Sequence, residues 1–267
     1  MPRFSILFFV LFAMYHFPAN AQEQSFFSDE EPVPQTVSDH HPLSFQFQAI
    51  SFLKNNEYFN PLDEGITFLG TAFNPRLKYD AGGRVTLIAG WYGILYSGKD
   101  KISLSLPYYH VAWQFTPGYF IKMGNINGFH NHRLPEPLFS YDRMYTEVPE
   151  TGVQITGNTK RHQTDVWLNW ENFILPGEND KEEFVIGGRT FVFLKPLSDG
   201  WNMALALNGI AAHRGGQVGA EGNMSTLMNS ACGLMAWYKP AQSTDSIGIR
   251  NDFCGYNDAS PVKMKLY

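Results

Sequence analysis

A dense group of charged and titratable side chains lies in the stretch 127–150. If this stretch folds into a pore, its arginines would face its acids across the opening, and such charge rings set the selectivity of channels. The residues that would form the constriction are Arg133, Glu136, Asp142, Arg143 and Glu150. The alternative is a solvated outer loop whose local ion pairs contribute little, and we favour this simpler interpretation.

No metal centre or cofactor site is expected. His130 and His132 lie close together but lack an evident third ligand, and the Asp39-His40-His41 group is typical of a solvated tail. The sequence also lacks the Gly-x-Ser-x-Gly, phosphate-loop and His-Glu-x-x-His patterns that carry familiar catalytic chemistry. We therefore predict no catalytic residues and a protein that is not an enzyme.

A second cluster allows a different function. Trp167, Trp170 and Glu171 follow Asp165, and aromatic rings beside paired carboxylates suit the binding or cleavage of sugars. A secreted or periplasmic β-sandwich that acts on glycans is therefore the alternative hypothesis. A sandwich does not explain why short and long connections alternate along this chain.

The elements that would position these groups are strands. Val166, Leu168 and Trp170 alternate with polar residues, which is the period of a strand with one apolar face. Charged residues on the opposite faces of several segments suit a wet lumen better than a dry core. These lumen-facing candidates are Lys122, Asp165, Glu171 and Arg189. The segments that we expect to form strands are 43–53, 66–79, 84–95, 102–115, 119–126, 151–158, 162–173, 183–194, 201–213, 231–239 and 246–256.

Short and long connections alternate along the chain. The short ones contain turn residues, as in Asp80-Ala81-Gly82-Gly83 and Thr116-Pro117-Gly118. The longest are 54–65, 127–150 and 214–230. An up-and-down sheet whose two ends meet different environments gives this pattern, and outer-membrane barrels have short turns at one end and long loops at the other.

The first residues have the features of an export signal. Arg3 precedes an apolar run, and small residues occupy the positions before a cut after Ala21. We predict a signal peptide over 1–21, a flexible acidic segment over 22–42, a β-barrel domain over 43–256 and an irregular tail over 257–267. Within the barrel domain, Cys232 and Cys254 could pair in an oxidising compartment or stay unpaired.

Composition agrees with a strand-rich exported protein. Aromatic residues make up 15% of the 267 residues and glycines number 24, which favours strands and tight turns over helices. Some of the aromatic residues, Tyr92 and Tyr108 among them, could form a belt at the membrane interface. The net charge of −5 argues against nucleic acid as a partner.

The long connection also carries a resemblance. His130-Asn131-His132-Arg133-Leu134-Pro135-Glu136, Asn55-Asn56-Glu57-Tyr58-Phe59-Asn60 and Trp167-Leu168-Asn169-Trp170-Glu171 are similar to segments of porin-like outer-membrane barrel proteins of Bacteroidota-type bacteria. The resemblance covers about 43–238, and it implies a passive channel without catalytic residues. The alternate positions before Tyr267 hold Lys263 and Lys265 instead of apolar residues, which predicts a truncated member.

We therefore expect an all-β, antiparallel up-and-down transmembrane β-barrel of about 10–12 strands. Its predicted function is passage of small hydrophilic solutes through the outer membrane. Its predicted partners are outer-membrane lipid, the barrel assembly machinery and those solutes.

Overall fold

Alternating apolar and polar side chains form strands through most of the chain. The computed structural model describes residues 42–60, 63–175, 177–178, 180–194, 200–215, 224–241 and 245–260. The predicted signal peptide, the segment that follows it and the predicted tail lie wholly or mainly outside these residues. The strands are β1 (Leu43–Asn60), β2 (Asp63–Ala81), β3 (Val85–Tyr96), β4 (Leu104–Thr116), β5 (Tyr119–Asn125), β6 (Thr151–Asn158), β7 (His162–Asn172), β8 (Glu183–Phe193), β9 (Trp201–Arg214), β10 (Ser225–Tyr238) and β11 (Ile247–Asp258).

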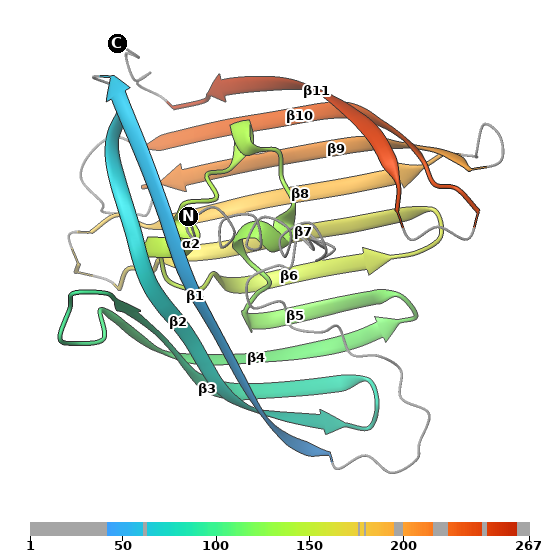
Figure 1. Ribbon diagram of the computed structural model, residues 1–267. Helices are drawn as coiled ribbons and strands as arrows, with labels where there is room; N and C mark the ends of the chain where they lie inside the picture. The colour runs from blue at the N-terminus through green and yellow to red at the C-terminus, as the bar shows by residue number, and fades with distance from the viewer. Residues whose placement is uncertain are drawn as a thin grey trace, which may run out of the picture.

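These strands form a single 11-stranded sheet in the order of the sequence, β1 to β11. Each strand pairs antiparallel with the next, so the predicted all-β, up-and-down arrangement is confirmed. The sheet curves round the segment between β5 and β6, and β1 and β2 run obliquely to the later strands (Figure 1). Within the described residues, β1 and β11 are the two edges of the sheet.

The two faces of the sheet reverse the usual distribution of polarity. The outer face, which points away from the segment between β5 and β6, exposes large apolar side chains, among them Phe45 (67%), Leu207 (42%) and Phe253 (80%). The inner face buries polar ones, among them Gln154 and Arg189. Exposed apolar area on this scale is rare on soluble monomers and is typical of a sheet that meets lipid.

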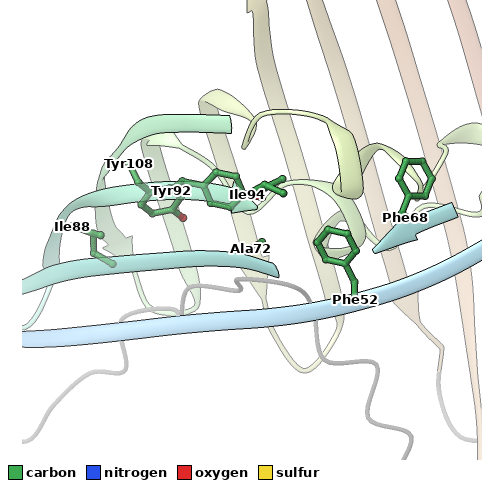
Figure 2. Close-up of a cluster of buried hydrophobic side chains, with 7 residues drawn as sticks. All are labelled: Phe52, Phe68, Ala72, Ile88, Tyr92, Ile94 and Tyr108. Carbon is green, nitrogen blue, oxygen red and sulfur yellow. The ribbon is translucent and has the colours of Figure 1, made fainter. Parts of the chain in front are cut away.

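Part of the inner face is nevertheless apolar. The buried side chains that pack together there come from β1 to β4 (Figure 2). They are Phe52, Phe68, Ala72, Ile88, Tyr92, Ile94 and Tyr108. Tyr92 and Tyr108, which the sequence suggested for an interfacial belt, are only 3% exposed and belong to this inner cluster.

Two connections are shorter than predicted. The connection expected over 54–65 is mostly strand, because β1 and β2 continue their ladder through Asn55↔Thr67 and Asn56↔Ile66. Thr67 donates to the Asn55 side chain at 2.6 Å, so polar cross-strand contacts support a region whose Asn and Pro content signals a loop. The connection expected over 214–230 is also shorter, because β10 begins at Ser225.

The β-sandwich alternative is wrong, because one continuous sheet contains every described strand. Trp167 is buried on the inner face and Trp170 is exposed on the outer face, so the two rings form no common sugar platform.

Cys232 and Cys254 are both unpaired and exposed. Cys254 lies opposite Ala231, and Cys232 lies opposite Phe253. The two cysteines therefore occupy opposite faces of the sheet, where a disulfide cannot join them. In the described part of the chain, no helix is long and apolar enough to cross a membrane.

Candidate functional site

The connection between β5 and β6 lies against the inner face of the sheet (Figure 1). It contains the 3-10 helices η1 (Phe129–His132) and η2 (Glu136–Leu138) and the one-turn helix α2 (Arg143–Thr146). We call residues 126–150 the inner loop. Its apolar residues Leu134, Leu138 and Phe139 pack in one buried cluster with Trp167 of β7 and Ala231 of β10.

His132 lies in a tight turn of this loop, at the end of η1. Phe129 and Arg133, which bracket the turn, have φ angles of 55° and 51°. Left-handed backbone is unfavourable for side chains of this size, so surrounding contacts must hold it. One such contact is the bond from the Phe129 amide to Glu150 Oε1 at 3.0 Å.

His132 is held between two carboxylates. Its Nδ1 lies 2.8 Å from Asp165 Oδ2, and its Nε2 lies 3.0 Å from Glu150 Oε2. The side chain is 0% exposed, and Glu150 and Asp165 are each 3% exposed. The contact with Glu150 lies within the inner loop, whereas the contact with Asp165 attaches the loop to strand β7.

The two carboxylates keep this imidazole charged. Burial by itself would lower the pKa of His132, but the hydrogen bonds and charges of Asp165 and Glu150 outweigh it and raise the pKa to about 9. Burial would likewise raise the pKa of Glu150, but the bond to His132 lowers it below its ordinary value. The group is therefore an imidazolium with two carboxylates at neutral pH.

The hydrogen bonds around His132 continue to strands β6 and β5. Gln154 of β6 donates to Asp165 Oδ1 at 2.8 Å, and its Oε1 accepts from the backbone amide of Asn127 at 2.8 Å. Lys122 of β5 donates to Asn127 Oδ1 at 2.7 Å. Lys122 of β5, Gln154 of β6 and Asp165 of β7 each form a hydrogen bond with a residue of the inner loop. Three strands therefore fix the position of the loop.

The inner loop also contacts strands β1 to β3, through the aromatic residue Tyr145 and the carboxylate of Asp142. Tyr145 stacks on Phe68 with ring centroids 5.3 Å apart, and Tyr96 donates to the Tyr145 carbonyl. Asp142 accepts hydrogen bonds from Lys54 and, at 2.9 Å, from Asn56 Nδ2. The inner loop therefore contacts both β1–β4 and β7–β10.

The predicted constriction residues do not form opposing rows of charge. Arg143 pairs with Glu147 at 2.6 Å and with Glu171 of β7. Glu150 pairs with His132 rather than with an arginine. Arg133 and Glu136 are exposed. The alternative of a fully solvated outer loop does not describe it either, because the loop packs inside the curved sheet.

Of the predicted lumen-facing residues, Lys122, Asp165 and Arg189 are buried on the inner face. Glu171 lies near the end of β7, where Arg143 contacts it.

Nothing in the spacing of the residues singles out Gln154, Asn127 or the role of His132. Alternation does place Gln154 and Asp165 on one face, but only the fold brings the loop against them. Among the described residues, no three His, Cys, Asp or Glu side chains are arranged to hold a metal ion.

Comparison with solved structures finds a mutant of the Rh. blastica porin. The match has 10% identity and a TM-score of 0.33, and it covers 79% of this chain and 100% of the porin chain. A likeness this weak shows nothing further about this chain, whose fold follows from its strand order and the polarity of its two faces. A comparison with curated proteins finds no match.

A family model described as "Lipid A 3'-O-deacylase-type" matches residues 35–267. The predicted resemblance to porin-like proteins holds for the antiparallel up-and-down strands, and this description now specifies the family. Because it names an enzyme, the prediction that the chain is not an enzyme is wrong. The chain belongs to the lipid A 3'-O-deacylase-type family.

Proposed function

We propose that the protein is an outer-membrane hydrolase that removes an ester-linked acyl chain from lipid A. The family match over residues 35–267 is the observation that carries this proposal. The apolar outer face supports placement of the strands in lipid, with outer-membrane lipid and the barrel assembly machinery as partners. The substrate would then lie in the same membrane as the enzyme.

The reaction consumes one water molecule. The water oxygen bonds to the acyl carbonyl carbon, and the bond between that carbon and the sugar oxygen breaks. The sugar oxygen takes up a proton and becomes a hydroxyl group, and the acyl chain leaves as a fatty acid. Negative charge develops on the carbonyl oxygen during this step, so hydrogen-bond donors placed around that oxygen accelerate it.

Donors converge where β1 meets the inner loop. Lys54 and Asn56 both donate to the carboxylate of Asp142, one to each oxygen. The Lys54 and Asp142 side chains are 36% and 33% exposed, so the cluster is accessible. We propose that a substrate carbonyl displaces the Asp142 carboxylate and receives the same donors, with Lys54 supplying positive charge.

His132 has a different role in this proposal. Both of its ring nitrogens contact carboxylates, so neither can accept a proton from water while the loop is docked. We assign it to holding the inner loop, which in turn positions Asp142 beside β1.

Lipid A from Gram-negative cells that express the chain tests the proposal. Mass spectrometry should show lipid A that lacks one acyl chain, and Lys54→Met should reduce this product by about a hundredfold, as loss of one oxyanion donor does. Lys78→Met is the matched control, because Lys78 lies on β2 and pairs with Asp80 at 3.3 Å, outside the Lys54–Asp142 cluster. Unmodified lipid A with wild-type protein in the outer membrane would reject the proposal.

Passage of small hydrophilic solutes stays a second candidate, because charged side chains line the inner face. The packed inner loop weighs against an open path. Planar bilayers decide this point: a channel should conduct, and Arg133→Ala with Arg143→Ala should change its ion selectivity. Absence of conductance by folded protein would remove this candidate.

A further inference from the structure

Arg189 of β8 is a buried cation whose hydrogen bonds are incomplete. It is 7% exposed, and its Nε and Nη1 atoms have no hydrogen-bond partner among the described residues. Asp165 lies directly opposite in the β7–β8 register. Both oxygens of that carboxylate are already used, one by His132 and one by Gln154. A buried guanidinium left in this state indicates a missing anionic partner.

Two further arginines approach the same place. Arg133 of the inner loop and Arg250 of β11 lie close enough to interact electrostatically with Arg189. Arg189 and Arg250 both approach the ring of Phe191, with their guanidinium carbons 4.7 and 5.5 Å from its centroid. Phe191, Ala206 and Gly233 lie in one cross-strand row, and Asp252 occupies the space over Gly233 at the end of that row.

The acids near this group leave positive charge in excess. Arg250 pairs with Asp252 at 2.6 Å. Within the described residues, neither Arg133 nor Arg189 forms a salt bridge to an acid. Because Arg133 is exposed, an anion can approach Arg189 from its side. Planar guanidinium groups bind phosphate through paired hydrogen bonds, and several of them can share one phosphate group.

We propose that Arg189, Arg133 and Arg250 form a phosphate-binding site between the inner loop and strands β8 and β11. The phosphate group comes either from a lipid headgroup or from free phosphate. The site shares no residue with the Lys54–Asp142 cluster, so the proposal does not depend on hydrolysis.

Titration calorimetry of the full chain in neutral detergent micelles tests the site, with three probes: inorganic phosphate, lipid A, and lipid A from which the phosphates have been removed. Arg189→Gln should weaken binding about tenfold or more, since a hydrogen bond to a charged group contributes that much. Arg143→Gln is the matched control, because Arg143 already pairs with Glu147 and Glu171, and it should bind as the wild type does.

Each result has a defined meaning. Binding of inorganic phosphate supports a soluble ligand, and binding of lipid A only while it is phosphorylated supports a headgroup. Phosphate should also raise the melting temperature of the wild type but not of Arg189→Gln. No phosphate-dependent binding by the folded wild type, or equal binding by Arg189→Gln, would overturn the proposal.

Discussion

The imidazole of His132 stacks on the indole of Trp167, with ring centroids 3.5 Å apart and planes 10° from parallel. His132 belongs to the inner loop and Trp167 to the wall, so this contact joins the two. The carboxylates of Glu150 and Asp165 hold the imidazole at its edges. Ring stacking and ion pairing therefore act together to fix the loop inside the sheet.

Removal of the imidazole should release the loop. His132→Ala removes the cation that bonds to both Glu150 and Asp165, and loss of one partner of a buried ion pair costs about 3–5 kcal/mol. Protease cleavage within 126–150 should become much faster than in the wild type. His162→Ala is the control, because His162 contacts Tyr119 and lies outside the loop network. Equal protection in both variants would contradict the role of His132.

Docking of the loop should depend on pH. Because the pKa of His132 is raised from 6.5 to about 9, its stabilising contribution is complete below about pH 6.5 and is lost as pH rises through about 9. The pKa of Glu150 is lowered, so its contribution is present above pH 4.5 and is lost as pH falls through its lowered folded value. The fluorescence of Trp167, taken as wild type minus Trp167→Phe, should report the alkaline transition.

Glu150→Gln provides the control for this titration. It removes one of the two carboxylates that stabilise the imidazolium, so the alkaline midpoint should move to lower pH. A midpoint that stays unchanged would show that Glu150 does not stabilise the charged ring.

Gly187 and Gly188 form a matched pair that tests the packing of Trp167. A Cβ at Gly187 would lie 2.1 Å from Trp167 Cζ2, whereas one at Gly188 meets nothing closer than 3.8 Å. Gly187→Ala should lower the free energy of unfolding by about 1–3 kcal/mol, the usual cost of overpacking. Gly188→Ala should change it little. Similar unfolding curves for the two variants would contradict the position of the indole.

An arginine placed on the outer face should impair insertion into the membrane. Val166 is 44% exposed on β7, and Val148 is 47% exposed in the inner loop. Val166→Arg should impair insertion, since arginine in the middle of a barrel's lipid-facing surface costs about 2–4 kcal/mol. Val148→Arg should insert normally. Heat-dependent gel mobility and recovery in the outer-membrane fraction measure the difference, and equal recovery would contradict a lipid-facing sheet.

Most strands could be predicted from the sequence, because alternation is a local signal. Val166 and Trp170 face outward and Asp165 inward, as their spacing indicates. The ends of β1 and β2 could not be predicted, since Asn55 and Asn56 look like loop residues until their partners on β2 are known.

The candidate site was less accessible to prediction. His132, Glu150 and Asp165 were visible as titratable groups, but their contact depends on a loop folding back onto β7. The sequence places Arg133 in a possible constriction and Arg189 on a possible lumen wall, whereas in the fold their charges act on each other. Sequence spacing contains no information on such long-range contacts, which arise only when the sheet has curved.

Hydrolysis by the purified protein is the most direct test of the central claim. Folded protein in micelles should release one fatty acid per lipid A molecule in water enriched in ¹⁸O, and the label should appear in the carboxyl group of that fatty acid. Folding is checked beforehand by the heat-dependent gel shift. No fatty acid release by folded protein, or release without the label, would contradict an acyl-ester hydrolase.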